Sequence, residues 1–445
     1  MDNQEELEFK KSYPYIFSFF YLAQGLYNGI QYIVIPFWLI SIMTIDLAVI
    51  LGIFSITVIP WALKFLIGLV NDKFGSERFG RRKLWILIFG IYAGIWFIIT
   101  GFTINLQSSD TILDYILLCA LMWNIGIAIA DTSLDGLILD VTPKENLGKV
   151  QGYTWAMNLF GNAGGGIILG ALFLAFDAIP LLFVFEGFLL IISCIFPFYV
   201  KERPLPENIQ VWSNMKEIMS KGKNWKVFSF SFLDSIPYGI VTIAYTILIL
   251  LYAPKSPIIG PVTSLALESE KILTAFLVYV LLGAINGGGV IVGSIVTGRI
   301  ADKNRRLAVY IANITYIPFL ITCVLFRGPY ILGSIMIFLI GAAQGALTAS
   351  YQSIRGDLSK QYPELNCTYF AIVISCLNLG QSVGMAITSV LITTFSAVFD
   401  EYYLTFFWIM LIMAGIQFLS FLIFKTINRK EYEHKHILKK YDLIQ

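Results

Sequence analysis

The chain has 445 residues, of which 57% are hydrophobic and only 13% are charged. Soluble domains carry about 25% charged residues, so this composition excludes an ordinary soluble protein. A formal net charge of +2 gives no basis for nucleic-acid binding, and the two histidines, His434 and His436, lie too near the chain end for an intramembrane relay. Five scattered cysteines without a CxxC pair predict neither disulfides nor a zinc site, and we expect no metal and no cofactor.

Apolar runs long enough to cross a bilayer recur along the chain and predict an all-α membrane protein. Twelve transmembrane helices are expected, near residues 13–40, 47–70, 83–104, 111–139, 149–176, 178–200, 224–254, 271–298, 307–327, 329–357, 366–395 and 402–427. An even number of spans puts both termini on one side. The loops on that side carry most of the lysine and arginine, which predicts cytoplasmic termini and a location in the plasma (inner) membrane.

The longest polar stretch divides the chain into two halves. We predict an N-terminal six-helix bundle, a cytoplasmic central loop, a C-terminal six-helix bundle and a cytoplasmic tail, at residues 1–200, 201–223, 224–430 and 431–445. The halves repeat at an offset of 220, which aligns Asp135-Gly136 with Arg355-Gly356 and Asn158 with Asn378. The repeat predicts two pseudo-symmetric bundles.

A short charged loop follows the second span and is echoed after the eighth. Each copy has Gly-x-x-x-Asp followed by an arginine pair: Gly68, Asp72, Arg81 and Arg82, then Gly298, Asp302, Arg305 and Arg306. This loop resembles the conserved loop of major facilitator superfamily (MFS) transporters, which lies between helices 2 and 3 and again between helices 8 and 9. The resemblance implies the MFS fold and a gating role for these residues. We expect Asp140, at the end of span 4, to meet Arg81 or Arg82 as a structural latch.

Polar residues form matching stripes in the two halves. Span 4 places Asn124, Asp131 and Asp135 on one helix face, and span 10 carries Gln344, Tyr351 and Arg355 at the corresponding places. We expect both faces to line one aqueous cavity that binds a polar solute. Further binding candidates at helical spacing on other spans are Gln24, Tyr27, Asn28, Gln31, Trp61, Lys64, Trp155, Asn158, Asp234, Tyr238 and Asn378.

Charged residues within the spans are the strongest functional signal, because each costs about 2.5–3.5 kcal/mol at the bilayer centre. Asp131 is expected near the midplane, where it handles a proton or substrate or is paired structurally. Asp135 and Asp234 are the other proton-coupling candidates, and no partner for Asp234 is visible in the sequence. Glu186 in span 6 is expected to be structural.

The pairing of these charges has alternatives. Asp135 and Arg355 occupy equivalent positions with opposite charge, so they form a salt bridge between the halves, or each pairs within its own half, for example Asp135 with Lys64. Lys64 itself snorkels to the cytoplasmic surface, pairs with Asp131 or Asp135, or holds an anionic substrate.

Glycines gather in span 5, from Gly161 to Gly170. They predict close packing against a neighbouring helix and bending of the span. A phosphate-binding loop is not expected, because no strand precedes the run and it lies in an apolar helix.

A narrower resemblance rests on Pro60-Trp61-Ala62-Leu63-Lys64-Phe65 before the loop, Phe79-Gly80-Arg81-Arg82-Lys83 after it, and Ala130-Asp131 to Asp135-Gly136 in span 4. These segments are similar to AmpG-type muropeptide permeases and their acetyl-CoA transporter relatives. The resemblance implies proton-driven uptake of a polar organic solute, with Lys64, Asp131 and Asp135 near the transport path. Glycoside–pentoside–hexuronide symporters carry a similar Arg-Phe-Gly-Arg-Arg loop, but their sodium-coupled members have acids in span 2, where this chain has Lys64.

The sequence thus favours a secondary transporter that works by alternating access, most simply a proton-coupled symporter of a sugar, amino-sugar, peptide or related solute. Its expected partners are the solute, protons or alternatively sodium, and the lipid bilayer, with the protein acting as a monomer. A uniporter, an antiporter and a non-transporting membrane sensor or scaffold are the alternatives. An enzyme is not expected, because the spans hold no histidine and no Ser-His or Cys-His arrangement.

Overall fold

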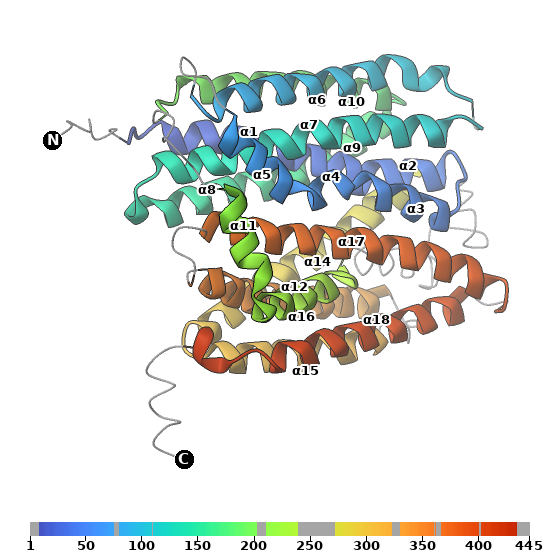
Figure 1. The fold of residues 1–445 in the computed structure, drawn as a ribbon. Coiled ribbons are helices and arrows are strands. Elements are labelled where there is room, and N and C mark those ends of the chain that lie inside the picture. Colours follow the sequence, from blue (N-terminus) through green and yellow to red (C-terminus); the bar gives the residue numbers. More distant parts are fainter. Residues whose placement is uncertain are drawn as a thin grey trace. The chain divides into compact units, whose positions relative to one another are not determined.

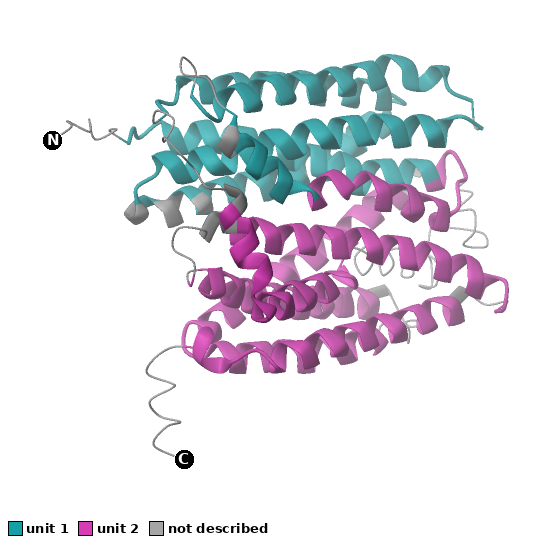
Figure 2. Cartoon of the chain, in the orientation of Figure 1, with its two compact units in different colours: residues 1–39, 63–211 teal, residues 40–62, 212–445 magenta. Residues whose placement is uncertain are grey.

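In the part of the chain that the computed structural model describes, the regular elements are all helices, as the sequence predicts. The structure describes residues 9–74, 80–108, 110–202, 211–238, 272–322, 330–359, 361, 366–399 and 402–433. By their contacts, these residues divide into two compact units, shown in different colours in Figure 2. The first unit comprises residues 1–39 and 63–211, and the second comprises residues 40–62 and 212–445.

Within the first unit, long helices follow one another with short connections (Figure 1). They are α1 (Tyr13–Gly29), η1 (Ile30–Val34), α5 (Lys64–Lys73), α6 (Lys83–Thr103), η2 (Ile104–Leu106), α7 (Ile112–Val141), α8 (Lys144–Ala163), η3 (Gly164–Leu169), α9 (Gly170–Ala175), α10 (Ile179–Ile195) and η4 (Phe196–Tyr199). Helix α6 packs against α7 and α10, and α1 packs against α8.

The second unit is built in the same way. Its elements are α3 (Leu47–Thr57), α4 (Ile59–Ala62), α11 (Val211–Ser220), α12 (Gly222–Ser235), α14 (Ile272–Ala301), α15 (Arg305–Thr322), α16 (Tyr330–Ser359), α17 (Asn366–Ser396), α18 (Tyr402–Lys425) and η7 (Arg429–Glu431). Helix α2 (Ile35–Ser41) contains the point at which the chain passes from one unit to the other.

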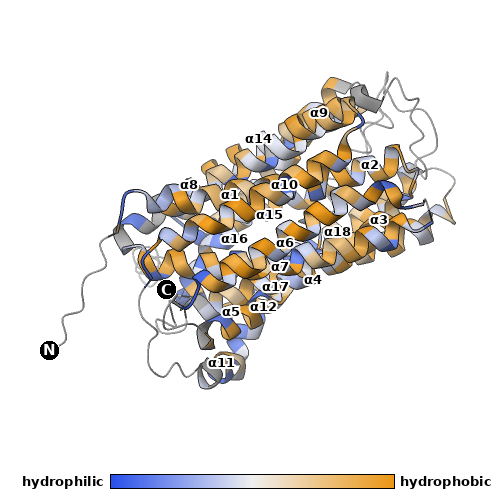
Figure 3. Ribbon diagram, turned by 90° about the horizontal axis from the view of Figure 1, so that it is seen from above, coloured by the Kyte–Doolittle hydropathy of each residue, from blue (hydrophilic) through white to orange (hydrophobic). Residues whose placement is uncertain are grey.

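Nine helical segments in the described part of the chain are long and apolar enough to cross a membrane. They correspond to the predicted spans 2 to 6, 8 and 10 to 12. Helix also occupies the predicted spans 1 and 9, as α1–η1–α2 and α15, and the start of span 7, as α12. Residues 239–254 of span 7 lie outside the described residues. Apolar residues run along the helices, while hydrophilic residues gather mainly at helix ends (Figure 3). The predicted α-helical membrane fold is confirmed.

The second predicted span is not one continuous helix. It is interrupted at Val58, just before Pro60, and again at Leu63, which separates α4 from α5. Proline supplies no backbone N–H and clashes with the preceding turn, so it favours a break here. The α3–α4 part packs against α17, where Ser382 Oγ donates to the Ser55 carbonyl at 2.5 Å. The α5 part packs against α7.

The glycine run of span 5 provides the close packing that the sequence predicts. At Gly161, a Cβ atom would lie 2.1 Å from the backbone oxygen of Leu22, and at Gly25 it would lie 2.0 Å from that of Asn158. Only glycine allows the backbones of α1 and α8 to approach so closely. Beyond Gly164, the helix continues as the π-helical segment η3, which packs against η1 and α1.

The predicted latch between span 4 and the arginine pair is confirmed. Arg81 Nη2 lies 2.7 Å from Asp140 Oδ2, and Arg82 Nε lies 3.4 Å from the same oxygen. Glu202 adds a contact that the sequence pattern does not predict. Its Oε1 accepts the backbone N–H groups of Arg81 and Arg82 at 3.0 and 2.8 Å. The carboxylate therefore lies at the positive end of α6, where it satisfies helix-terminal donors.

The second unit repeats this arrangement with different residues. Arg305 Nε lies 2.9 Å from Asp357 Oδ2, and Glu433 accepts the backbone N–H groups of Arg305 and Arg306 at 3.0 and 3.2 Å. Asp302 is largely exposed and lies 3.6 Å from Arg305. At Gly298, an added Cβ would meet open space, and at Gly68 it would touch only Thr132, at 3.9 Å. The side chain of Asp72 lies outside the described residues.

We expect Glu202→Ala to lower the thermal unfolding midpoint of the detergent-purified protein, because it removes the acceptor for two N–H groups at the start of α6. Helix-capping losses of this kind cost about 1 kcal/mol. The matched control is Glu217→Ala, since Glu217 is exposed and its ion pair with Lys221 is a surface pair. Equal midpoints for the two variants would contradict the capping role.

Candidate functional site

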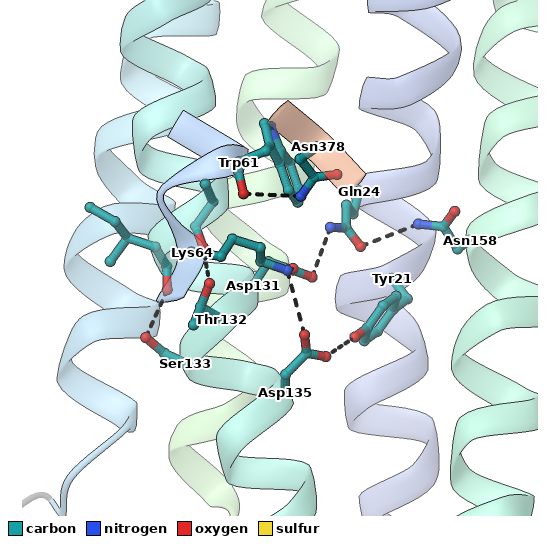
Figure 4. A network of polar contacts seen from close by, with 12 residues as sticks. Tyr21, Gln24, Trp61, Lys64, Asp131, Thr132, Ser133, Asp135, Asn158 and Asn378 are labelled. Atoms are coloured by element: carbon teal, nitrogen blue, oxygen red, sulfur yellow. Dashed lines mark hydrogen bonds and ion pairs between the residues drawn. The ribbon is translucent and has the colours of Figure 1, made fainter. Parts of the chain in front are cut away.

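In the first unit, Lys64 lies between two carboxylates of α7 (Figure 4). Asp131 and Asp135 are four residues apart, so helical periodicity turns both toward α5. The ammonium of Lys64 hydrogen-bonds to Asp131 Oδ2 and lies 3.6 Å from Asp135 Oδ2. Asn71 Nδ2, about two helical turns after Lys64, donates to Ser133 Oγ at 2.6 Å and ties α5 to α7. Of the predicted alternatives for Lys64, pairing with the aspartates is the one observed.

Helix α1 completes this group, which we call the Lys64 cluster: Lys64, Asp131, Asp135, Tyr21 and Gln24. Tyr21 donates its hydroxyl to Asp135 Oδ1, and Gln24 Nε2 donates to Asp131 Oδ1 at 2.8 Å. The two carboxylates differ in access, because the side chain of Asp131 is 4% exposed and that of Asp135 is 42% exposed. One ammonium thus faces two carboxylates, which leaves the fully ionised cluster with an excess negative charge.

A second polar layer lies farther along α1 and α7 and is fully buried. Tyr27 donates to Asn124 Oδ1 at 2.5 Å, while Asn124 Nδ2 and Trp123 Nε1 both donate to Gln31 Oε1, at 2.8 and 2.9 Å. Trp123 also stacks on Phe97, with ring centroids 4.4 Å apart. Three predicted binding candidates, Tyr27, Gln31 and Asn124, are therefore bonded to one another in the core of the unit.

The second unit contains a buried ion pair of its own, between α12 and α16. Arg355 Nη2 lies 2.8 Å from Asp234 Oδ2, and their side chains are 2% and 9% exposed. Arg355 Nε also donates to Ser231 Oγ at 3.0 Å. The guanidinium lies over the rings of Phe230 and Tyr351, 5.3 and 5.5 Å from their centroids.

Helices α15 and α18 close around this pair. Gln417 Nε2 lies 3.2 Å from Asp234 Oδ1 and 3.1 Å from Asn313 Oδ1, and Asn313 Nδ2 donates to the Tyr351 hydroxyl at 3.2 Å. We call Asp234, Arg355, Ser231, Asn313 and Gln417 the Arg355 cluster. The cluster therefore joins four helices of the unit, α12, α15, α16 and α18.

Of the alternative pairings, the structure shows those within each unit. Asp135 and Arg355 each have an oppositely charged partner within their own unit, Lys64 and Asp234 respectively. Asp234, for which the sequence showed no partner, is paired with Arg355.

The other predicted binding residues differ in their burial and in their hydrogen-bond partners. Asn158 Nδ2 donates to Gln24 Oε1 at 3.2 Å, and Asn378 Nδ2 donates to the Trp61 carbonyl at 2.9 Å. Gln344 is buried and Asn28 is half-buried. Trp155 and Tyr238 have exposed side chains.

Glu186 is buried in α10, and neither of its carboxyl oxygens has a hydrogen-bond partner among the residues that the structure describes. Phe183, one turn earlier on α10, packs against Phe97 and Trp123, with ring centroids 6.1 Å away in each case. An ionised carboxylate in such apolar surroundings would be costly, so the neutral acid is the form that fits.

Several residues of the site were not foreseen from the sequence. Tyr21 lies one turn before Gln24 on α1 and could have been found by extending that polar stripe. Asn313 and Gln417 are isolated amides in apolar spans, and only their depth in the membrane marks them. Among the described residues, no group of three or more His, Cys, Asp or Glu side chains is arranged to hold a metal ion.

The fold and these buried charge clusters define an integral membrane protein with polar groups inside its helical bundles. The family model of the Major Facilitator Superfamily matches residues 16–363 and 281–440. The chain therefore belongs to the Major Facilitator Superfamily, a family of transporters rather than enzymes.

Two relatives match parts of the chain by sequence. "Putative transporter AmpG 1" of Rickettsia conorii is 27% identical over 250 residues, which is 52% of this chain and 56% of that protein. "Uncharacterized membrane protein YBR220C" of Saccharomyces cerevisiae is 28% identical over 150 residues, which is 30% of this chain and 27% of that protein. The chain thus spans about half or less of the length of each relative.

Solved structures share the fold. A D-xylose–proton symporter superposes with a TM-score of 0.69 at 14% identity, over 95% of this chain and 98% of that one. The nucleoside transporter NupG gives 0.62 at 13% identity, over 92% and 98%. A bacterial homologue of the human lysosomal transporter Spinster gives 0.64 at 16% identity, over 95% and 98%.

We expect Asp234→Leu or Arg355→Met alone to destabilise the protein by about 3–5 kcal/mol, since each leaves an uncompensated buried charge. The double variant should recover much of the loss, because it removes both charges and keeps apolar volume. Thermal unfolding in detergent measures this, with the exposed Asp302→Ala as the control. A double variant as unstable as the sum of the singles would show that the two charges are not coupled.

Glu186→Gln is expected to leave the thermal midpoint unchanged, because glutamine has the size and neutrality of the protonated acid. Glu186→Lys, which introduces a cation at the same buried place, should lower the midpoint strongly. A large loss in the glutamine variant would mean that Glu186 is ionised and paired.

Proposed function

We propose that the chain is a secondary active transporter that carries a small polar organic solute together with protons by alternating access. The single observation behind this proposal is the Lys64 cluster, in which one ammonium faces two carboxylates inside the membrane. A bound proton neutralises the excess charge, and intramembrane acids of this kind commonly serve as proton sites. Rocking of residues 1–200 against 224–430, with both termini cytoplasmic, is the accompanying conformational proposal.

The ion pairs favour a neutral or cationic solute over an anionic one. Lys64 is held by Asp131 and Asp135, and Arg355 is held by Asp234 and Ser231. An anionic solute would have to displace a carboxylate from either cation. Hydroxyl- or amide-rich solutes without a carboxylate, such as sugars and amino-sugars, need not displace either ion pair. A D-xylose–proton symporter and a nucleoside transporter are among the structures with this fold, which agrees with a solute of that kind.

The test is to add candidate solutes to proteoliposomes that contain a pH-sensitive dye and to follow proton entry. We expect one class of neutral or cationic solutes to drive proton entry, and carboxylated or phosphorylated analogues to be inactive. Protein-free liposomes are the control. Solute entry without proton movement would indicate a uniporter, and proton exit on solute entry would indicate an antiporter. Absence of any solute flux across the panel would favour the sensor or scaffold.

A further inference from the structure

The two carboxylates of the Lys64 cluster are not equivalent, and their surroundings assign them different roles. We propose that Asp135 is the group that takes up and releases the coupling proton, while Asp131 stays ionised as the counter-ion of Lys64. This inference rests on the proposed proton-coupled transport. It names the residue that performs the coupling and the one that does not.

Among the described residues, the side chains that hydrogen-bond to Asp131 are donors. Its Oδ2 accepts from the Lys64 ammonium, and its Oδ1 accepts from Gln24 Nε2 at 2.8 Å. The amide of Gln24 is oriented by Asn158, whose Nδ2 donates to Gln24 Oε1 at 3.2 Å. Neither an ammonium nor the NH₂ of an amide can accept a hydrogen bond. A protonated Asp131 would therefore point its O–H at another donor, so its site is built for the carboxylate.

Asp135 has a partner that can reverse its role. Tyr21 donates to Asp135 Oδ1, and a phenol hydroxyl can also accept a hydrogen bond from a neutral carboxylic acid. Lys64 forms an ion pair with Asp135 Oδ2 at 3.6 Å, a longer contact than its hydrogen bond to Asp131 Oδ2. With 42% of its side chain exposed, Asp135 also has access to water, which must deliver and remove the proton.

The charged and titratable groups facing Asp135 are Tyr21 from α1, Lys64 from α5 and Asp131 from its own helix. With Asp135 ionised, Lys64 is shared between two carboxylates. With Asp135 protonated, the cluster is neutral, and Asp131 is its remaining carboxylate. The bound proton therefore changes how strongly Lys64 is attracted toward Asp135.

The position of Lys64 links this change to the backbone. Lys64 is the first residue of α5 and directly follows the interruption at Leu63, whose backbone is non-helical (φ −91°, ψ 7°). A change in the electrostatic attraction between Lys64 and Asp135 therefore acts at the interruption in span 2. Such element-terminal residues are the ones that absorb backbone changes in hinge motions.

The experiment compares Asp135→Asn with Asp131→Asn in proteoliposomes, using any solute that the wild type carries with protons. Asparagine at position 135 imitates the protonated acid. We expect this variant to retain downhill solute flux, to lose its pH dependence, and to accumulate solute to a ratio of about 1 under a pH gradient, as uncoupled transport requires. Asp131→Asn should instead lose downhill flux and lower the thermal midpoint, because Lys64 loses its buried counter-ion.

Asp114→Asn is the matched control, since Asp114 is an exposed aspartate in the first turn of the same helix, and it should behave as wild type. Tyr21→Phe should shift the pH midpoint of transport without abolishing coupling. Retained proton-driven accumulation in Asp135→Asn would overturn the proposal, as would retained downhill flux with lost coupling in Asp131→Asn. If the wild type itself moves solute without protons, the proposed symport fails instead, and the two failures are thereby distinguished.

A readout independent of transport is the carboxylic C=O band in pH-difference infrared spectra of the reconstituted protein. We expect wild type and Asp131→Asn to share a titrating band that Asp135→Asn lacks. If Asp135→Asn does not fold, Asp135→Glu serves in its place and should displace the band. A band that disappears only in Asp131→Asn would reverse the assignment and overturn the proposal.

Discussion

An ionised side chain inside a lipid-embedded bundle needs an opposite charge within reach, and this requirement shapes both units of the protein. In the described part of each unit, a buried basic residue meets it, Lys64 in the first and Arg355 in the second. The acids facing them differ in number. Arg355 has a single, well-buried aspartate and additional hydrogen bonds, whereas Lys64 faces two aspartates with unequal exposure. The Arg355 cluster is thus balanced, and the Lys64 cluster is open to a further positive charge.

The two units share their polar contacts at helix ends and differ in the polar residues within the spans. Both have an arginine–aspartate latch, and in both a glutamate accepts the backbone N–H groups of the adjacent arginine pair. These contacts lie at helix ends, where backbone donors must be satisfied whatever the protein carries. The polar groups deeper in the spans have diverged, with Asp135 in one unit and Arg355 at the equivalent place in the other. The contacts that repeat in both units thus belong to the shared architecture. The polar residues that differ between the units form the candidate site.

The helical fold, the position of the spans and the latch at Asp140 were predictable, because hydropathy, helical periodicity and motif spacing act along the chain. Periodicity also placed Asp131 and Asp135 on one face. Helical periodicity does not give the rotation and depth of one helix relative to another. These determine that Asp234 contacts Arg355 and that Tyr21 contacts Asp135. Gln417 and Asn313 belong to helices far apart in the sequence, and a single chain carries no signal that joins them. Asp135 and Arg355 align in the sequence repeat, and each has an oppositely charged partner within its own unit.

The break in span 2 has a bearing on how this protein can be dissected. Residues 40–62 precede the middle of the chain, yet they belong by their contacts to the unit formed mainly by residues 212–445. A fragment that stops at the central loop would contain α3 and α4 without α17. The complementary fragment would contain α17 without α3 and α4, which pack against it. Each fragment would therefore lack one side of the contact between α17 and the α3–α4 segment. Reconstitution from separately expressed fragments would have to restore this exchange of segments as well as the covalent order of the helices.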